Sequence, residues 1–150
     1  MTNIPSVISI NISPGGIPKL PVAEVFVATA VLRGDGRLHD KHLTPERAVS
    51  LIDEEILQQL RQEGFPVAPG VMGENLTVQS LDVQHMQPGA HLRFAGGVEI
   101  ELTEQRKPCY VLDAIHPVLK DACIGRCGFL ARVVREGILR VGEEITVSKE

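Results

Sequence analysis

A single cysteine lies where an alternating segment ends, next to two basic residues. Cys109 follows Arg106-Lys107-Pro108, and the alternating segment 98–102 precedes this run. A thiolate, rather than a thiol, is the sulfur nucleophile and the ligand of soft metals, and nearby positive charge lowers a cysteine pKa. Arg106 and Lys107 could supply that charge, so Cys109 is the first candidate for chemistry. On these local features alone, a buried cysteine that only fills space is an equally good interpretation.

Two further cysteines, Cys123 and Cys127, are separated by three residues. A structural zinc site needs four ligands, usually with a second closely spaced pair, and the sequence has no second pair. Gly125 and Gly128 flank Arg126 and Cys127, a pattern that suits a loop whose amides and guanidinium hold an anion. A β-turn with an exposed arginine fits the same residues. Three cysteines cannot all pair within one chain, which favours thiol chemistry or packing over a disulfide framework.

Basic and titratable residues precede the one segment that is typical of a helix. They are His39, Lys41 and His42, and Arg47 adds a charge in the first turn. Because a helix N-terminus attracts anions, this group is a candidate phosphate site. Glu74 and Asn75 follow a glycine at the start of a β-like segment, which by composition is an ordinary turn. Paired carboxylates, a Ser-His-Asp arrangement, a Walker loop and a dinucleotide fingerprint are all missing from the sequence.

The sequence predicts one main amphipathic helix, over about residues 44–63. Thr44 suits the N-cap, Pro45 the first helical position, and Gly64 the stop. Apolar residues recur between them at helical spacing, at Ala48, Leu51, Ile52, Ile56 and Leu60.

Most of the remaining chain is predicted to form short strands. In residues 7–13, isoleucines alternate with polar residues, and residues 22–32 form a second β-rich run. Glycine and proline signals separate the later β-like segments, which are 75–78, 91–94, 98–102, 129–134 and 138–147. This many short strands with one helix favours a mostly β fold, a barrel or a sandwich.

Length and composition predict one domain over residues 1–150. The chain is 43% apolar and 23% charged, which is enough to bury one core. A net charge of −4, no tryptophan and few aromatic residues argue against a nucleic-acid partner. The sequence shows neither an apolar run long enough for a membrane span nor a signal peptide. We therefore expect a cytoplasmic protein with no membrane partner.

Seven motifs, in this order along the chain, resemble those of the MOSC family, the domain found at the C-terminus of molybdenum-cofactor sulfurases and as small free-standing bacterial proteins. The motifs are Ser13-Pro14-Gly15-Gly16-Ile17-Pro18-Lys19, Gly34-Asp35, Glu46-Arg47-Ala48-Val49, Gly73-Glu74-Asn75-Leu76-Thr77, Arg106-Lys107-Pro108-Cys109, Gly125-Arg126-Cys127-Gly128-Phe129 and Arg140-Val141-Gly142-Glu143-Glu144-Ile145. The chain is more similar to a free-standing member than to a fused sulfurase, so no pyridoxal-phosphate site is expected.

The resemblance implies a β-barrel that binds the molybdenum cofactor, molybdopterin, or a sulfur-bearing precursor of it. Cys109 matches the family's cysteine, which carries sulfur as a persulfide or ligates molybdenum, and Cys127 is the alternative ligand. The resemblance also implies a pocket for the pterin phosphate, with a wall formed by Lys19, Arg47, Glu74, Asn75, Arg106 and Arg126.

Three activities are compatible with this resemblance. The first is sulfur transfer, and the second is molybdenum-dependent reduction of N-hydroxylated compounds with electrons from a separate redox partner. The third is non-catalytic carriage of the cofactor between biosynthetic proteins or molybdenum enzymes.

Overall fold

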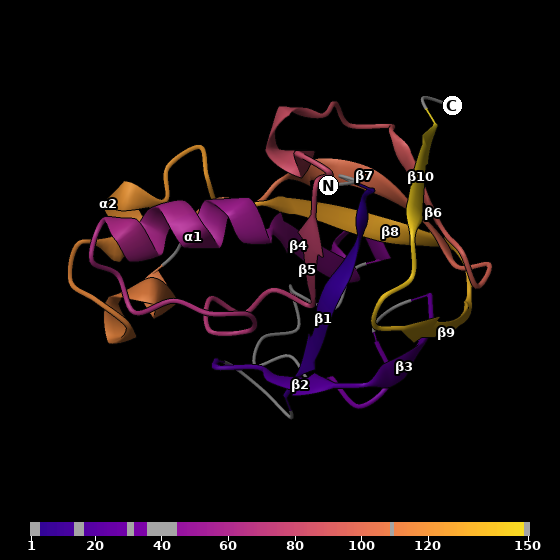
Figure 1. Ribbon diagram of the computed structural model, residues 1–150, viewed down its shortest axis with the longest axis horizontal. Helices are drawn as coiled ribbons and strands as arrows, with labels where there is room; N and C mark the ends of the chain where they lie inside the picture. The colour runs from indigo at the N-terminus through magenta and orange to yellow at the C-terminus, as the bar shows by residue number, and fades with distance from the viewer. Residues whose placement is uncertain (1–3, 14–16, 30–31, 36–44, 109, 149–150) are drawn as a thin grey trace.

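The computed structural model describes residues 4–13, 17–29, 32–35, 45–108 and 110–148. Strands dominate these residues, as predicted, together with one main helix and short 3-10 turns (Figure 1). The strands are β1 (Ser6–Ile12), β2 (Leu20–Val22), β3 (Glu24–Val27), β4 (Val49–Asp53), β5 (Leu76–Gln79), β6 (His91–Phe94), β7 (Glu99–Gln105), β8 (Phe129–Arg135), β9 (Gly137–Arg140) and β10 (Ile145–Ser148). The helices are α1 (Glu54–Gln62) and α2 (Leu119–Ala122), and the 3-10 turns are η2 (Pro45–Arg47), η3 (Val83–His85) and η4 (Tyr110–Ala114).

Eight strands form one sheet in the order β10-β6-β7-β8-β4-β5-β1-β2, and β3 pairs with β9 in a second sheet. The neighbours β4 and β5 run parallel, and the other paired strands run antiparallel. The amide of Val7 donates to the carbonyl of Glu143 at 3.0 Å, and the amide of Ile145 donates to Pro5 at 2.8 Å. These bonds draw the start of β1 to the start of β10, so the large sheet curls. Its order still ends at β10 and β2 among the described residues, and the predicted closed barrel is not seen there.

The helix predicted over residues 44–63 is wrong in its first half. Residues 45–47 form a 3-10 turn and Val49–Asp53 form strand β4, so the helix begins only at Glu54. All five residues of β4 are buried, because the strand lies between β5 and β8 with both faces covered. A fully buried strand such as β4 carries apolar residues on both faces, and some of these residues match helical spacing by chance. Gly64 does follow the helix end, with a positive φ of 100°.

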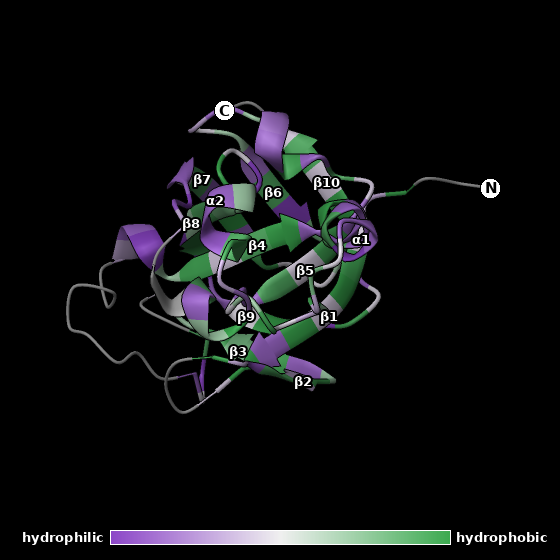
Figure 2. Cartoon of the chain, turned by 90° about the vertical axis from the view of Figure 1, so that its left-hand side faces the viewer, coloured by the Kyte–Doolittle hydropathy of each residue, from purple (hydrophilic) through white to green (hydrophobic). Residues whose placement is uncertain are grey.

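Two apolar clusters hold the fold together. The larger one fills the sheet region, where Figure 2 shows hydrophobic residues along the central strands. The smaller one, which we call the helical core, lies at the end of the molecule where α1 and α2 gather (Figure 1). Its buried members are Ile52, Ile56, Leu57, Leu60, Phe65, Val67, Met72, Leu112, Leu119, Cys123 and Cys127. Two of the three cysteines are therefore packed in the helical core. No helix in the described part of the chain is long and apolar enough to span a bilayer.

Candidate functional site

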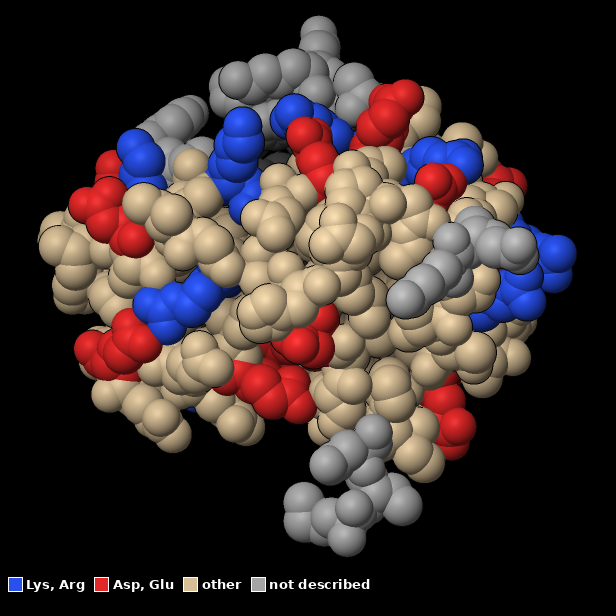
Figure 3. All heavy atoms as spheres, turned by 90° about the horizontal axis from the view of Figure 1, so that it is seen from above, with Lys and Arg blue, Asp and Glu red and all other residues tan. Residues whose placement is uncertain are grey.

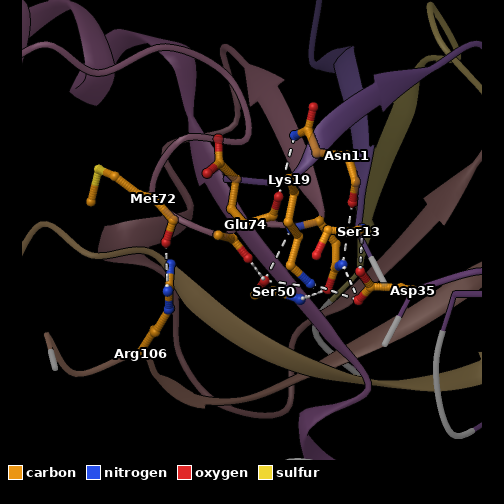
Figure 4. A network of polar contacts seen from close by, with 10 residues as sticks. Asn11, Ser13, Lys19, Asp35, Ser50, Met72, Glu74 and Arg106 are labelled. Carbon is orange, nitrogen blue, oxygen red and sulfur yellow. Dashed lines mark hydrogen bonds and ion pairs between the residues drawn. The ribbon is translucent and has the colours of Figure 1, made fainter. Parts of the chain in front are cut away.

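A buried polar network lies where β1, β4 and the start of β5 meet (Figure 4). The side-chain oxygen of Asn75 accepts from the amide of Ser50 at 3.0 Å, and its Nδ2 donates to Asp35 at 3.0 Å. The Nδ2 of Asn11 donates to the hydroxyl of Thr77 at 3.1 Å. Buried polar groups are costly unless they are paired, so this network holds three strands and the Asp35 loop in one arrangement.

Lys19 belongs to this network through a buried ion pair. Its Nζ lies 2.6 Å from Oδ2 of Asp35, whose side chain is completely buried. The other carboxylate oxygen of Asp35 accepts from the amide of Ser13 at 2.9 Å. The backbone of Lys19 is also held, because its amide donates to the carbonyl of Gly70 at 2.9 Å. The charge of Lys19 is thus compensated inside the fold.

Glu74 carries a buried carboxyl group in which only one of the two oxygens is hydrogen-bonded to described residues. Its Oε2 accepts from the amide of Gly70 at 2.9 Å and from the hydroxyl of Thr77 at 2.8 Å. Its Oε1 is buried and has no hydrogen-bond partner among the described residues. Burial raises the pKa of Glu74, while these two hydrogen bonds and the positive charge of Arg106 act in the opposite direction.

Arg106 presents a complementary unpaired atom. Its Nη2 donates to the carbonyl of Met72 at 2.7 Å, while Nη1 is buried without a partner among the described residues (Figure 4). The guanidinium also lies close to the turn before Glu74, since a Cβ built on Gly73 would come within 3.3 Å of Nη2. A buried acceptor on Glu74 and a buried donor on Arg106 therefore belong to adjacent parts of one site.

The raised pKa of Glu74 gives a testable pH dependence. The folded protein holds this proton more tightly than the unfolded chain, in which the carboxyl titrates near its ordinary value of 4.5. The contribution of Glu74 to stability is therefore fully present below that value and is lost as pH rises through the folded-state pKa. We expect the free energy of unfolding of the wild type to fall relative to that of Glu74→Gln as pH rises above 4.5. Urea unfolding of both proteins at a series of pH values from below 4.5 upward measures the difference, and a wild type that becomes more stable relative to Glu74→Gln as pH rises would contradict the assignment.

Cys123 and Cys127 share a hydrogen bond inside the helical core. Both residues are buried, with 0% and 1% of their surface exposed. The hydrogen bond from Cys123, helped by the positive charge of Arg106, lowers the pKa of Cys127 to about 7 against the effect of burial. The same hydrogen bond and burial raise the pKa of Cys123. Cys127 thus has thiolate character, and the charges of Arg106 and Glu74 both act on it.

The other two predicted cations each form an ion pair near the surface. Arg126 forms a bidentate ion pair with the carboxylate of Glu63, with N–O distances of 2.7 and 2.9 Å. Its Nε donates to the carbonyl of Ala122. The guanidinium of Arg47 lies 3.1 Å from the carboxylate of Glu104, with both side chains partly exposed. The structure therefore brings Lys19, Glu74, Asn75 and Arg106 into one region, and gives Arg47 and Arg126 acidic partners of their own.

Four predicted candidates, Cys109, His39, Lys41 and His42, lie outside the described residues. In the sequence, Cys109 stands three positions after Arg106 and immediately before η4. Sequence reasoning missed the polar partners in the network. The only signal for Asn11 is an amide between two isoleucines in a strand pattern, and Ser50 lay inside the wrongly predicted helix.

A separate cleft of about 640 Å³ opens between α1, η3 and the loop before β8. Its lining includes Asp53, Ser80, Asp82 and Arg126. The buried carboxylate of Asp53 accepts from the amides of Leu81, Asp82 and Val83 at 2.8–3.0 Å. These bonds hold a turn in which Ser80 and Asp82 have positive φ.

Charges of opposite sign lie next to one another on the face shown in Figure 3. Three ion pairs that join strands or flank them show the same mixing, namely Arg93–Glu99, Arg132–Glu101 and Arg140–Glu24. The part of the chain that the structure describes holds no cluster of three or more His, Cys, Asp or Glu side chains suited to a metal ion.

The sheet-dominated fold and its buried polar network can be compared with those of known protein families. The sequence profile of the MOSC domain matches residues 38–146, so the chain belongs to the MOSC family.

Two solved structures show the same fold. The crystal structure of the YuaD protein from Bacillus subtilis has a TM-score of 0.83 at 16% identity, over 97% of this chain and 96% of that one. The crystal structure of YiiM from Geobacillus stearothermophilus has a TM-score of 0.77 at 26% identity, over 96% of this chain and 75% of that one.

A curated protein from Gibberella moniliformis, named "Reductase", is 25% identical over 131 residues. The match covers 82% of this chain and 23% of that protein, so the chain spans about a quarter of its length.

Proposed function

We propose that this MOSC domain binds the molybdenum cofactor, or a sulfur-bearing precursor of it, beside Arg106 and Glu74. In this proposal, Cys109 is the thiol that carries sulfur or ligates molybdenum. Membership of a family associated with molybdenum-cofactor binding and sulfur transfer supports the class of ligand. Oε1 of Glu74 and Nη1 of Arg106, which are buried without hydrogen-bond partners among the described residues, support the place.

The chemistry of the cofactor fits what these residues offer. Molybdopterin carries a phosphate, a pterin ring with N–H groups and a dithiolene that binds the metal. Nη1 of Arg106 is a charged donor to which no described residue offers an acceptor, and guanidinium groups bind phosphate through charge-assisted hydrogen bonds. Oε1 of Glu74 is an acceptor to which none of the described residues donates, and it suits an N–H group of the ring. An unpaired buried polar atom costs about 1–3 kcal/mol, so a ligand that pairs with both atoms would be favoured.

The chain's own residues divide the work in this proposal. Arg106 would hold the phosphate, and Glu74 would orient the ring. Lys19 and Asn75 fix Asp35 and so keep the wall rigid. Arg47 and Arg126 could join the wall only by giving up their present acidic partners. The bound cofactor would supply a metal centre able to exchange two electrons.

The reductase activity has one specific observation in its favour, which is the relative named "Reductase". The activity of that whole protein reaches this chain only as a proposal, because the match covers 23% of it. Reduction would need a separate redox partner. A non-catalytic carrier role, the association with molybdenum enzymes and the cytoplasmic location stay predictions.

The decisive experiment is metal and pterin analysis of protein purified from a host that makes the cofactor. We expect the wild type to retain both, and Cys109→Ser to lose molybdenum. Arg106→Gln should weaken retention about tenfold or more, because a lost charge-assisted hydrogen bond is worth about 1.5–3 kcal/mol. Arg132→Gln, the same change in an exposed strand ion pair, is the matched control and should behave as the wild type.

Three outcomes would count against parts of the proposal. Wild type purified without molybdenum and pterin would overturn it. Metal retained by Cys109→Ser but lost in Cys127→Ser would move the ligand to Cys127. Cofactor retention without turnover of N-hydroxylated bases, given a chemical electron donor, would favour the carrier over the reductase.

A further inference from the structure

The proposed function places its thiol chemistry on Cys109, which leaves the thiol pair of the helical core, Cys123 and Cys127, to be explained. Cys123 ends the short helix α2, and Cys127 lies directly before Gly128 and β8. A turn joins them, in which the amide of Arg126 donates to the carbonyl of Cys123 at 2.8 Å. This turn sends both side chains inward to the same cluster, where their sulfur atoms share a hydrogen bond. Two cysteines four positions apart that one hydrogen-bonded turn joins, and that pack in the same small cluster, are placed to react with each other.

The surroundings of the two thiols differ in a way that favours a reaction between them. Arg106 and Glu74 both act on Cys127, and Arg126 and Arg106 act on Cys123. The shared hydrogen bond favours negative charge on the sulfur of Cys127 and keeps the proton on Cys123. One partner is thus disposed to act as the nucleophile, and the other is a protonated thiol directly beside it.

The loop that carries the pair lies at the surface although its sulfur atoms do not. Gly125 and Arg126, which stand between the cysteines, line the cleft beside α1, and Ile124 is 70% exposed. The side chain of Ile124 points away from the core to which its two cysteine neighbours belong. Local opening of such a loop requires little of the fold to move, so a small oxidant can reach the sulfur atoms without global unfolding.

We propose that Cys123 and Cys127 form a redox-active dithiol, which a peroxide converts to an intramolecular disulfide. The sulfur of Cys127 attacks one peroxide oxygen, the O–O bond breaks, and the second oxygen leaves as water or an alcohol after taking up a proton. Cys127 is then a sulfenic acid. The sulfur of Cys123 attacks the sulfur of Cys127, the S–O bond breaks, and water leaves with the proton of Cys123. Two thiols are oxidised by two electrons in total, and the peroxide is reduced by two.

Trypsin can test this pairing directly, because it cuts between the two cysteines. Cleavage after Lys120, Arg126 and Arg132 puts Cys123 in peptide 121–126 and Cys127 in peptide 127–132, while Cys109 falls in peptide 107–120. The full chain is treated with hydrogen peroxide, its remaining thiols are blocked with iodoacetamide, and the digest is analysed by mass spectrometry. We expect peptides 121–126 and 127–132 to appear linked, with the link absent after treatment with dithiothreitol.

Peroxide treatment of cysteine variants shows whether the disulfide needs Cys123 and whether it forms without Cys109. Cys109→Ser should form the link as the wild type does, which also makes the test independent of the proposed cofactor site. Cys123→Ala should give no link and should instead carry sulfinic or sulfonic acid at Cys127. Thermal unfolding and circular dichroism show whether each variant is folded.

Three results would overturn the proposal. The first is a link between peptides 107–120 and 127–132 in place of the expected one. The second is oxidation of Cys127 to the sulfonic acid in the wild type with Cys123 left as a thiol. The third is native wild type whose three thiols all survive peroxide and are alkylated only after denaturation.

Discussion

Gly128→Ala should destabilise the protein by on the order of 3 kcal/mol or more, because backbone atoms already occupy the space that a Cβ needs. A Cβ built on Gly128 would lie 2.2 Å from the carbonyl oxygen of Leu51. The residue also has a φ of 89°, which side chains other than that of glycine rarely allow. Leu51 is in β4 at the centre of the large sheet, so neither backbone can move aside cheaply. Urea unfolding followed by circular dichroism measures the change.

The matched control for this variant is Gly125→Ala in the same loop. Gly125 also has a positive φ, of 76°, but a Cβ there meets nothing within 4 Å. We therefore expect only the conformational cost of a positive φ, about 1 kcal/mol. Equal losses in the two variants would show that the close approach of Gly128 to Leu51 is not what demands a glycine.

Lys19→Met should reduce the free energy of unfolding by about 3–5 kcal/mol, the typical cost of removing one partner from a buried ion pair. The methionine side chain fills similar space, but the carboxylate of Asp35 stays completely buried and loses its cation. The donors on Ser13 and Asn75 remain and soften the loss only in part. Denaturant unfolding at pH 7 gives the value.

A double variant tests whether the stranded charge is the cause. Lys19→Met combined with Asp35→Asn should be more stable than Lys19→Met alone, because the buried charge is gone. Arg132→Met, which breaks the pair with Glu101 at an exposed position, should cost no more than about 1 kcal/mol. A loss at Lys19 as small as that at Arg132 would mean that the buried pair contributes no more than a surface pair.

The strands could be predicted from the sequence wherever turn residues bound a short β-rich run. The predicted run 91–94 coincides with β6, and the run 7–13 contains most of β1. The alternation of isoleucines and polar residues in β1 does not show which side chains are buried, since Ser9 and Asn11 are buried together with Ile10. A buried polar residue in a strand looks like a solvent-facing one in the sequence. Its burial becomes clear only from hydrogen-bond partners that are distant in the sequence, such as Thr77 for Asn11.

Local sequence could not show the partners that decide the character of the site. The residues around Arg126 suit either an anion-binding loop or a β-turn with an exposed arginine, and neither interpretation shows its partner Glu63, which is 63 positions away. Lys19 and Asp35 are 16 positions apart, and nothing in either segment marks them as a pair. The places of Lys19, Arg47, Glu74, Asn75, Arg106 and Arg126 are now described, while their binding roles stay predictions.

The hydrogen bonds between the start of β1 and the turn before β10 bear on when this chain can fold. Val7 donates to Glu143 and accepts from Gly142, so the first strand is completed by residues more than 130 positions later in the chain. A growing chain usually folds its earlier units first, but here β1 gains some of its hydrogen bonds only from residues far downstream. During synthesis, β1 with its three isoleucines can pair with β2 and β5, but its hydrogen bonds to the turn before β10 form only after residues 142–145 emerge. Until then, the start of β1 offers unpaired backbone groups to which another chain could bind.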